Sequence, residues 1–311
     1  QEARRKRRAF RVPKPEIFAD AAKFDKFGGD DMTGATDWQT RVGDVWATEW
    51  RRTDRSFADL SRHLNAAILA AAPDSGSILD IGCGAGGTSL ALATARPDLA
   101  ITGVDLSPAL IAVAQSRAAE AGLVPGPSFI VAAADELAPT PAYDLLVSRH
   151  GVMFFADPVA AFTRLRQVAR PGARLVFSCF SPRAENRFAT LTDDLAGIPP
   201  TIPNGYQPGP FAFADPRTVT AILTEAGWIT DAAARVAFDY RAGQGDDPVA
   251  DAVAFLSRIG PVSLLLRDAD PADRPRLLAA LAEHLDFHRH EDTVDLPATA
   301  WIWRAHAGAP A

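Results

Sequence analysis

The fold is decided by one short stretch, Ile78-Leu79-Asp80-Ile81-Gly82-Cys83-Gly84-Ala85-Gly86-Gly87. An apolar run ends in a carboxylate, and glycines then alternate with small residues until a helical pattern begins at Thr88. This pattern predicts a buried parallel strand over 77–81, followed by a sharp backbone turn that glycine permits. Because the turn opens a helix, a ligand can approach the main chain closely at the helix N-terminus.

A second acid follows one strand later along the chain. Residues 100–104 form another short apolar run, and Asp105 closes it. In an open α/β sheet, an acid at this position reaches the crevice beyond the strand ends, where it can bind the two hydroxyls of a ribose. The two strands together therefore predict a cofactor that contains a nucleoside.

The glycine pattern by itself fits two classes of cofactor. Gly82, Gly84 and Gly87 satisfy G-x-G-x-x-G, the pattern of dinucleotide-binding enzymes. Asp80 favours the other class, because a carboxylate two residues before the first glycine repels a diphosphate but suits an ammonium group. The chain also lacks a second glycine-rich strand-turn-helix of the dehydrogenase type. An NAD(P)-binding oxidoreductase is therefore the alternative.

The motifs resemble those of the class I S-adenosylmethionine (SAM) dependent methyltransferases. The first family motif, an acid followed by G-x-G-x-G, is matched by Asp80, Gly82, Gly84 and Gly86. The second, an acid that closes strand two, is matched by Asp105. The resemblance implies SAM as cofactor and methyl transfer to a small-molecule acceptor. A SAM-binding regulator without turnover is the alternative from outside the enzymes.

The resemblance covers roughly residues 38–307. It implies an α/β fold: a Rossmann-like, doubly wound sheet of seven strands, mostly parallel, with an antiparallel C-terminal hairpin that carries a helical insertion. A closer likeness is to a bacterial subgroup akin to ubiquinone/menaquinone C-methyltransferases. The stretches that carry this likeness are 148–158, 181–186, 209–216 and 255–268.

We expect residues 38–311 to form one methyltransferase domain. Helices over 38–76 precede the sheet, and an ordered loop over 181–214 and helices over 247–290 lie near the acceptor pocket. The tryptophans at 38, 46 and 50 fall on one stripe of a helix, and this helix packs on the domain with Trp46 covering SAM or its acceptor.

The adenine end of the cofactor site departs from the family pattern. An acid after strand three often reads the adenine amino group, but Ala133 stands at that position here. Asp135, or the backbone of Ala133 and Ala134, would then take its place. The cofactor-binding residues that the resemblance implies are Asp80, Gly82, Cys83, Gly84, Gly86, Asp105, Leu106, Ala134, Asp135 and Ser148.

Methyl transfer asks little of the protein, because the sulfonium of SAM is already activated and the acceptor only has to be held in line. His150 is the candidate base, since it follows strand four on the acceptor side; the alternative is a histidine that only bonds its loop. Arg149 would anchor an acidic acceptor group or a backbone carbonyl. Phe211 and Phe213 alternate as in an extended segment, so we expect one of them to face the acceptor.

Charge is distributed unevenly along the 311 residues, whose net charge is −6. Residues 1–14 hold seven basic residues against Glu2, which leaves 25 basic and 37 acidic residues elsewhere. An acidic body argues against a nucleic-acid acceptor. We expect residues 1–37 to be a disordered basic leader, the alternative being contact with RNA or an anionic membrane.

Several further features indicate a cytoplasmic protein. No run of 18 apolar residues predicts a membrane span, and the leader lacks the apolar segment of a secretory signal. Cys83 and Cys179 fall on strands that the family order keeps apart, so we expect no disulfide. The histidines at 284, 288 and 290 have no acid or cysteine at a convincing spacing, and we predict no metal site.

Overall fold

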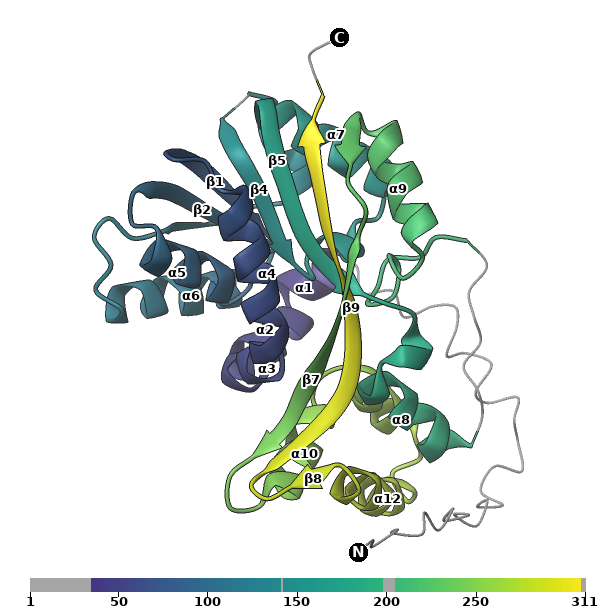
Figure 1. Cartoon of the computed structure of the whole chain (residues 1–311). Coiled ribbons are helices and arrows are strands. Elements are labelled where there is room, and N and C mark those ends of the chain that lie inside the picture. The colour runs from purple at the N-terminus through teal and green to yellow at the C-terminus, as the bar shows by residue number, and fades with distance from the viewer. Residues whose placement is uncertain (1–34, 141, 198–204, 309–311) are drawn as a thin grey trace, which may run out of the picture.

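The computed structural model describes residues 35–140, 142–197 and 205–308 (Figure 1). The predicted disorder of the leader therefore falls almost wholly outside the described residues, as do residues 198–204 of the predicted 181–214 loop.

A mostly parallel sheet forms the centre of the molecule. Its main path runs in the order β3-β2-β1-β4-β5-β9-β6, and β9 is antiparallel to both of its neighbours on that path. The order reverses between β1 and β4, as in doubly wound sheets. The predicted fold class is confirmed. The strands are β1 (Gly76–Ile81), β2 (Leu99–Asp105), β3 (Ser128–Val131), β4 (Tyr143–Arg149), β5 (Ala169–Phe180), β6 (Trp228–Thr230), β7 (Ala234–Gln244), β8 (Arg289–His290) and β9 (Thr293–Ala307).

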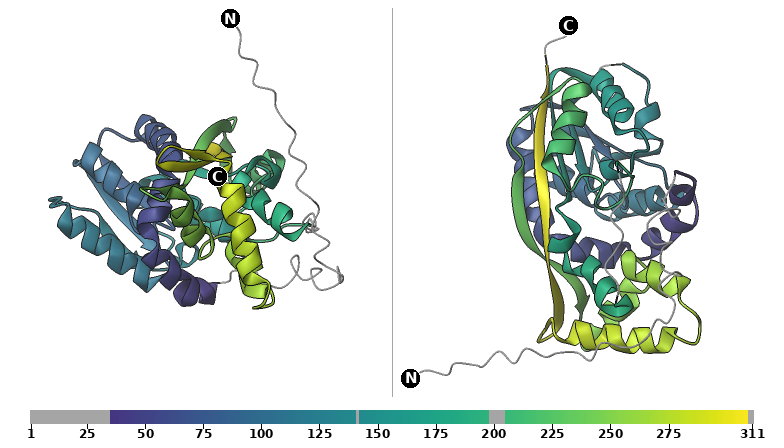
Figure 2. Two further views of the ribbon diagram at one scale, coloured as in Figure 1. Left: turned by 90° about the horizontal axis from the view of Figure 1, so that it is seen from below. Right: turned by 90° about the vertical axis from the view of Figure 1, so that its right-hand side faces the viewer.

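The C-terminal hairpin is longer than the sequence predicts. One long strand was expected over 229–240; it is present as β6 and β7, which pair antiparallel with opposite ends of β9. Together β7 and β9 extend well beyond the other strands and carry a helical lobe at their far end (Figures 1 and 2). The lobe is the predicted insertion within the hairpin, because α10, α11 and α12 lie between β7 and β8 in the chain.

The helices flank the sheet or belong to this lobe. Besides short 3-10 turns they are α1 (Ala35–Gln39), α2 (Arg41–Thr48), α3 (Trp50–Ser56), α4 (Ala58–Ala71), α5 (Gly87–Ala95), α6 (Pro108–Glu120), α7 (Pro158–Val168), α8 (Arg187–Ala196), α9 (Pro216–Glu225), α10 (Pro248–Leu256), α11 (Pro261–Asp268) and α12 (Arg274–Asp286).

Both faces of the central strands are buried. Ile78 and Leu145 pack with residues of α4 and α5, whereas Leu79 and Leu146 pack with residues of α7 and α9. Successive side chains of a strand point to opposite faces of its sheet, so a nearly continuous apolar run is needed when helices cover both. The same alternation leaves Asp80 at the carboxyl end of β1, on the face where α5 begins.

Four helices share one start signal, a capping residue followed by proline. The proline supplies a helical φ at the first turn, and the preceding side chain accepts a bond from a free backbone N–H. Ser107, for example, accepts from the N–H of Leu110. The four pairs are Ser107-Pro108, Asp157-Pro158, Asp215-Pro216 and Asp247-Pro248.

The tryptophan stripe does not lie on one helix. The chain turns at Thr40 and Glu49, where no side-chain cap is present, and makes three short helices, α1 to α3. Gly43 shows why α2 sits where it does. A Cβ there would come within 2.2 Å of the Trp38 carbonyl oxygen and 2.3 Å of Ser107 Oγ, so only glycine lets α2 approach the start of α6.

The prediction of a loop over 181–214 is wrong for its first half, where α8 forms. The buried side chains of α8 include Phe188, Leu191 and Leu195, at the three- and four-residue spacing of one helix face. The prolines and glycines that follow concealed this short pattern.

Two other expectations concern the chain as a whole. Cys83 and Cys179 are free cysteines, in line with the expectation of no disulfide between them, and both are buried. Among the described residues no single helix is long and apolar enough to cross a membrane. The pair α10 and α11 meets that criterion only when joined, and it is bent by 70°.

Candidate functional site

A cavity of about 390 Å³ lies at the carboxyl ends of β1, β2 and β4. This is where the strand order reverses, the usual position of ligand sites in such sheets, and the volume suits a small molecule. One side is the glycine loop after β1 and the ends of β2 and β3. The other sides come from α1 to α3, from α8 and β7, and from the turn between α10 and α11.

The glycine loop borders the cavity directly. Gly82 and Gly84 line it with φ of 61° and 53°, left-handed values that glycine adopts freely. A Cβ on Gly84 would point into open space, whereas one on Gly86 would lie 2.8 Å from Phe129 and 3.0 Å from Ala114. Gly86 does not line the cavity. Its predicted cofactor contact is corrected: this glycine lets the loop pack closely on α6 and β3.

Asp80 is a buried acid with one free oxygen. The side chain is 1% exposed, its Oδ2 accepts a bond of 2.6 Å from the Ser89 hydroxyl, and its Oδ1 has no partner. Burial raises the pKa of Asp80 to about 6, although the Ser89 bond opposes the rise. An anion in this state gains from a cation placed beside it in the cavity.

Asp105 ties the glycine loop to the start of α6. Its Oδ2 accepts the Gly84 N–H at 2.8 Å and its Oδ1 accepts the Ser107 N–H at 2.9 Å. Burial raises its pKa, and the backbone bonds from Ser107 and Gly84 oppose the rise. The carboxylate lines the cavity, and each of its oxygens retains a lone pair for a ligand hydroxyl.

The predicted adenine end is also part of the cavity wall. Leu106, Ala134 and Asp135 line it, together with Ala133 and the unpredicted Glu136. Asp135 is exposed and Ala134 is buried.

Ser148 supports the site without touching the cavity. Its hydroxyl donates to the Ile81 carbonyl at 2.8 Å and accepts the Gly151 N–H at 3.1 Å. Since the residue is fully buried and absent from the lining, its predicted cofactor contact is corrected to a positioning role. It joins the end of β1 to the turn after β4.

His150 is held in one orientation at the cavity wall. Its backbone N–H donates to the Ser178 carbonyl at 3.1 Å, and its Nδ1 lies 2.9 Å from Ser178 Oγ. Its Nε2 is buried without a partner. The residue has a φ of 62°, a strained value typical of functional sites. Burial and the nearby Arg149 lower its pKa to about 3, so the ring is neutral at neutral pH.

Arg149 is already paired within the protein. Its guanidinium bonds Asp54 Oδ1 at 2.7 Å, and Asp54 Oδ2 bonds Arg117 at 2.8 Å. Burial alone would raise the pKa of Asp54, but the two arginines outweigh it and lower the pKa. Arg117 also bonds the Ala85 carbonyl and lies 4.0 Å from the Trp50 ring centroid. The partner of Arg149 is thus Asp54 of α3, and not the acidic acceptor group or backbone carbonyl that was predicted. The ion-pair network fastens α3 to the glycine loop.

The aromatic lining differs from the prediction. Trp46 lines the cavity as expected, with Trp38 and Trp50. Phe213 is fully buried against Phe162 and Phe177 and does not line it. Phe211 is half-buried and packs behind Phe180 and Phe188, which do line the cavity. The expectation that Phe211 or Phe213 faces the acceptor is wrong.

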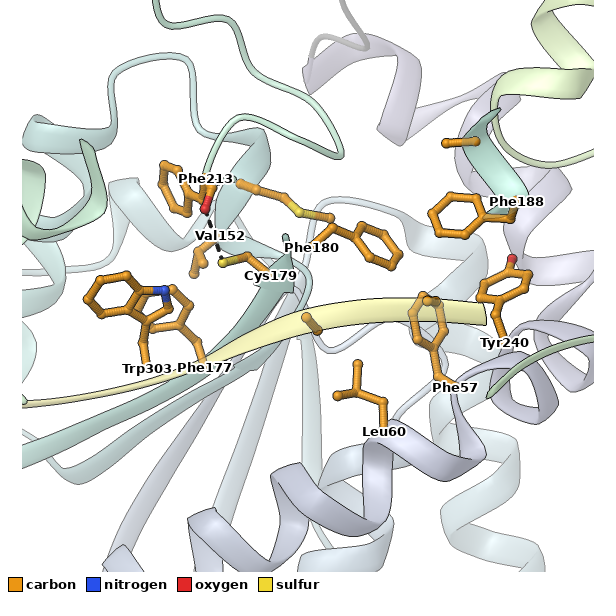
Figure 3. Close-up of a cluster of buried hydrophobic side chains, with 14 of the residues drawn as sticks. Phe57, Leu60, Val152, Phe177, Cys179, Phe180, Phe188, Phe213, Tyr240 and Trp303 are labelled. Atoms are coloured by element: carbon orange, nitrogen blue, oxygen red, sulfur yellow. Dashed lines mark hydrogen bonds between the residues drawn. The ribbon is translucent and has the colours of Figure 1, made fainter. Parts of the chain in front are cut away.

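The aromatic residues that do face the cavity come from separate elements. Four of them have rings in mutual contact, tilted, edge to face or stacked, with centroids 4.7 to 5.8 Å apart (Figure 3). No local sequence signal marks them as a set. These four are Phe57, Phe180, Phe188 and Tyr240, with Leu256 and Ile259 beside them in the lining; Phe154 and Phe155 also line the cavity.

Unpaired polar atoms gather at this cavity. Among the described residues, eight buried side-chain polar atoms lack a hydrogen-bond partner, and four belong to residues that line it. Buried polar groups are nearly always paired in folded proteins, so such a concentration marks the position of a ligand's polar atoms. The four are Trp38 Nε1, Thr53 Oγ1, Asp80 Oδ1 and His150 Nε2.

Comparison with known proteins points to one family. Residues 79–177 match the family described as methyltransferase domain. Demethylmenaquinone methyltransferase of Thermus thermophilus is 33% identical over 137 residues, which are 43% of this chain and 60% of that protein. Trans-aconitate 2-methyltransferase of Methylobacterium nodulans is 30% identical over 46% of this chain and 54% of that protein. Ajmaline N-methyltransferase of Rauvolfia serpentina is 36% identical over 32% of this chain and 34% of that protein. The chain thus spans about a third to three fifths of the length of these relatives.

Solved structures share the fold. A Bacillus halodurans protein assigned as a methyltransferase has a TM-score of 0.51 at 13% identity, over 79% of this chain and 99% of that chain. Phosphoethanolamine N-methyltransferase 2 of Haemonchus contortus has a TM-score of 0.50 at 17% identity, over 88% of this chain and 60% of that chain. That structure was solved with phosphomonomethylethanolamine and S-adenosylhomocysteine.

Proposed function

We propose that this chain, a member of the class I SAM-dependent methyltransferases, binds SAM in the cavity and transfers its methyl group to a small-molecule acceptor. The observation that carries the proposal is the pair of acids at the ends of β1 and β2. Asp80 and Asp105 both line the cavity, and Asp80 keeps one buried oxygen without a partner.

The two acids fit two polar parts of SAM. The free Oδ1 of Asp80 suits the ammonium group of the methionine part, because a cation relieves the cost of the buried charge. Asp105 suits the ribose hydroxyls, as it is fixed by the N–H groups of Gly84 and Ser107. Charged-acceptor bonds of this kind contribute about 1.5–3 kcal/mol each.

A dinucleotide fits the same residues poorly. Its diphosphate would sit at the start of α5, next to Asp80, which lines this part of the cavity and has no cationic partner among the described residues. A buried carboxylate close to a diphosphate repels it, so an NAD(P) oxidoreductase is not favoured.

SAM, when bound, supplies a methyl group that is already activated for transfer. The protein's own residues then hold the acceptor in line and exclude water, and such positioning can lower a barrier by about 7–11 kcal/mol. Trp38, Trp46 and Trp50 form one wall of the cavity, and the Asp54 ion-pair network keeps α3, which carries Trp50, against the glycine loop.

Calorimetric titration tests the cofactor proposal. We expect SAM and S-adenosylhomocysteine to bind the purified chain and NADH not to bind. Asp105→Ala should weaken SAM, whereas Asp246→Asn, which changes an exposed acid outside the cavity, should not. Tight NADH binding without SAM binding would overturn the proposal.

Transfer itself needs a separate measurement. Incubation with SAM carrying a radiolabelled methyl group and a panel of small molecules should move the label to at least one of them. If SAM binds but no label moves to any small molecule, a regulator without turnover becomes the better reading. The relatives are named for different acceptors, so the panel should be chemically broad.

A further inference from the structure

The acceptor side of the cavity is a box of aromatic rings with very little free charge. Phe57 lies 5.6 Å from Tyr240 and 5.8 Å from Phe180 between ring centroids. Phe188 stacks on Tyr240 at 4.7 Å and 22°. Flat rings arranged in this way offer van der Waals and offset-stacking surface to another flat ring.

The charged groups on this side are already engaged in ion pairs. Outside the cofactor segments 80–88, 104–110 and 132–136, the charged residues of the described lining are Asp54 and Arg149, which bind each other at 2.7 Å, and Asp54 also binds Arg117 at 2.8 Å. An ionised acceptor would therefore enter without a free counter-charge, which is costly in an apolar site. The box favours a molecule without charge.

His150 supplies one polar contact within this box. Its ring centroid is 4.2 Å from that of Phe180 and 5.1 Å from that of Phe57. The residue is 8% exposed, and its Nε2 has no partner in the protein. A polar atom buried among aromatic rings at a cavity wall needs a ligand atom to complete its bonding.

The bonding of Ser178 indicates which proton His150 carries. Among the described residues, the one hydrogen-bond partner of Ser178 Oγ is His150 Nδ1. The Ser178 hydroxyl can therefore donate its proton to Nδ1. If Ser178 donates to Nδ1, the ring proton is on Nε2 and a single group stays unpaired. The opposite tautomer leaves both the hydroxyl proton and Nε2 unpaired, which costs more. Nε2–H is therefore a donor directed at the ligand.

We propose, resting on the proposed methyltransferase function, that the acceptor is an uncharged, flat and mostly apolar molecule with an oxygen that accepts a hydrogen bond from His150 Nε2–H. His150 is then a recognition residue that donates a bond, in place of the base predicted from the sequence. The neutral ring suits this task, because a proton taken up here would create a buried cation beside Arg149.

Four naphthalenes of similar shape test the proposal. They are 2-acetylnaphthalene, 2-ethylnaphthalene, 2-naphthoate and 2-(aminomethyl)naphthalene, titrated into the full chain saturated with S-adenosylhomocysteine. We expect the ketone to bind about threefold to tenfold more tightly than the ethyl compound, the range of one net hydrogen bond. Both ions should bind at least about tenfold more weakly than the ketone.

Two variants identify the atom responsible. His150→Phe keeps a ring but removes Nε2, so the preference for the ketone over the ethyl compound should vanish. His63→Phe makes the same change at an exposed site and should preserve it. The affinity for S-adenosylhomocysteine and the melting temperature, measured in parallel, show that the fold and cofactor site are intact.

The ring proton can also be located without a ligand. In a chain labelled with ¹⁵N-histidine, which holds six histidines, the signals lost in His150→Phe belong to His150. Their shifts should show a protonated Nε2 and a bare Nδ1.

The proposal is overturned by either ion binding as tightly as the ketone, by a ketone preference that survives in His150→Phe, by a proton on Nδ1, or by none of the four compounds binding. In each case intact binding of S-adenosylhomocysteine leaves the cofactor proposal standing. Loss of that binding in the wild-type chain is a failure of the proposed function instead.

Discussion

Replacing Asp80 by Asn should make the cofactor-free protein more stable while it weakens SAM. The carboxylate is buried, and its pKa of about 6 lies above the ordinary 3.8. Between these two pH values the folded protein binds more protons than the unfolded chain. The stability from this group is therefore fully present below about pH 3.8 and is lost as the pH rises through about 6.

The magnitude follows from the shift. About two pKa units at 1.36 kcal/mol each correspond to about 3 kcal/mol. Asparagine carries no charge and retains an oxygen for the Ser89 hydroxyl, so Asp80→Asn escapes most of this cost. Above pH 7 we expect the variant to exceed the wild type in free energy of unfolding by up to about 3 kcal/mol, and the difference to shrink toward zero near pH 4.

Urea denaturation of both proteins from pH 4 to pH 8 measures this difference, with Asp246→Asn as a control whose difference should stay flat. Adding S-adenosylhomocysteine at a hundred times its dissociation constant should stabilise the wild type by about 2.7 kcal/mol. The variant, which lacks the partner for the ammonium group, should gain much less. A pH-independent difference, or a variant less stable than the wild type at pH 8, would refute the assignment of a strained, buried carboxylate.

Four further substitutions separate binding from packing. Asp105→Ala should weaken SAM roughly tenfold to a hundredfold by calorimetry, the effect of losing a charged acceptor; unchanged affinity in a folded variant would remove the ribose assignment. Gly84→Val should abolish SAM binding, because its side chain enters open space beside the loop, whereas Gly86→Ala should chiefly lower the melting temperature, since its Cβ meets Phe129 at 2.8 Å. If Gly84→Val binds SAM normally, the loop is not the site. Phe213→Ala should cost about 3–5 kcal/mol in urea denaturation with little change in SAM affinity, as expected of a core ring; a large affinity loss at small stability cost would return it to the pocket.

The part of the site that the sequence predicts is the part that is contiguous in the chain. Asp80 and Asp105 each close an apolar run, and a parallel sheet brings the ends of adjacent strands to one edge, so their placement follows from local pattern and fold class. However, the motif contains both Gly84 and Gly86 and does not indicate which of them faces the cavity. One faces the cavity and the other faces Phe129, a residue more than forty positions away that only the folded chain brings near.

The acceptor side could not be predicted, because its residues meet only through long-range packing. Phe57, between α3 and α4, contacts Tyr240 of β7, which is more than 180 positions away in the chain, and neither residue stands in a motif. The alternation of Phe211 and Phe213 suggested a wall, yet Phe213 turns into the core and Phe211 packs behind Phe180. The sequence did not indicate a partner for Arg149, because that partner, Asp54, lies on α3. The regular tryptophan spacing suggested one continuous helix there and hid the breaks that place α3.

The most direct test of the account is a crystal structure of the chain with S-adenosylhomocysteine. We expect the amino group of the ligand within about 3 Å of Asp80 Oδ1 and both ribose hydroxyls on the Asp105 carboxylate. The sulfur should then border the box formed by Phe57, Phe180, Phe188 and Tyr240. A nucleoside bound elsewhere, or bound in the cavity with neither acid in contact, would contradict the central claim.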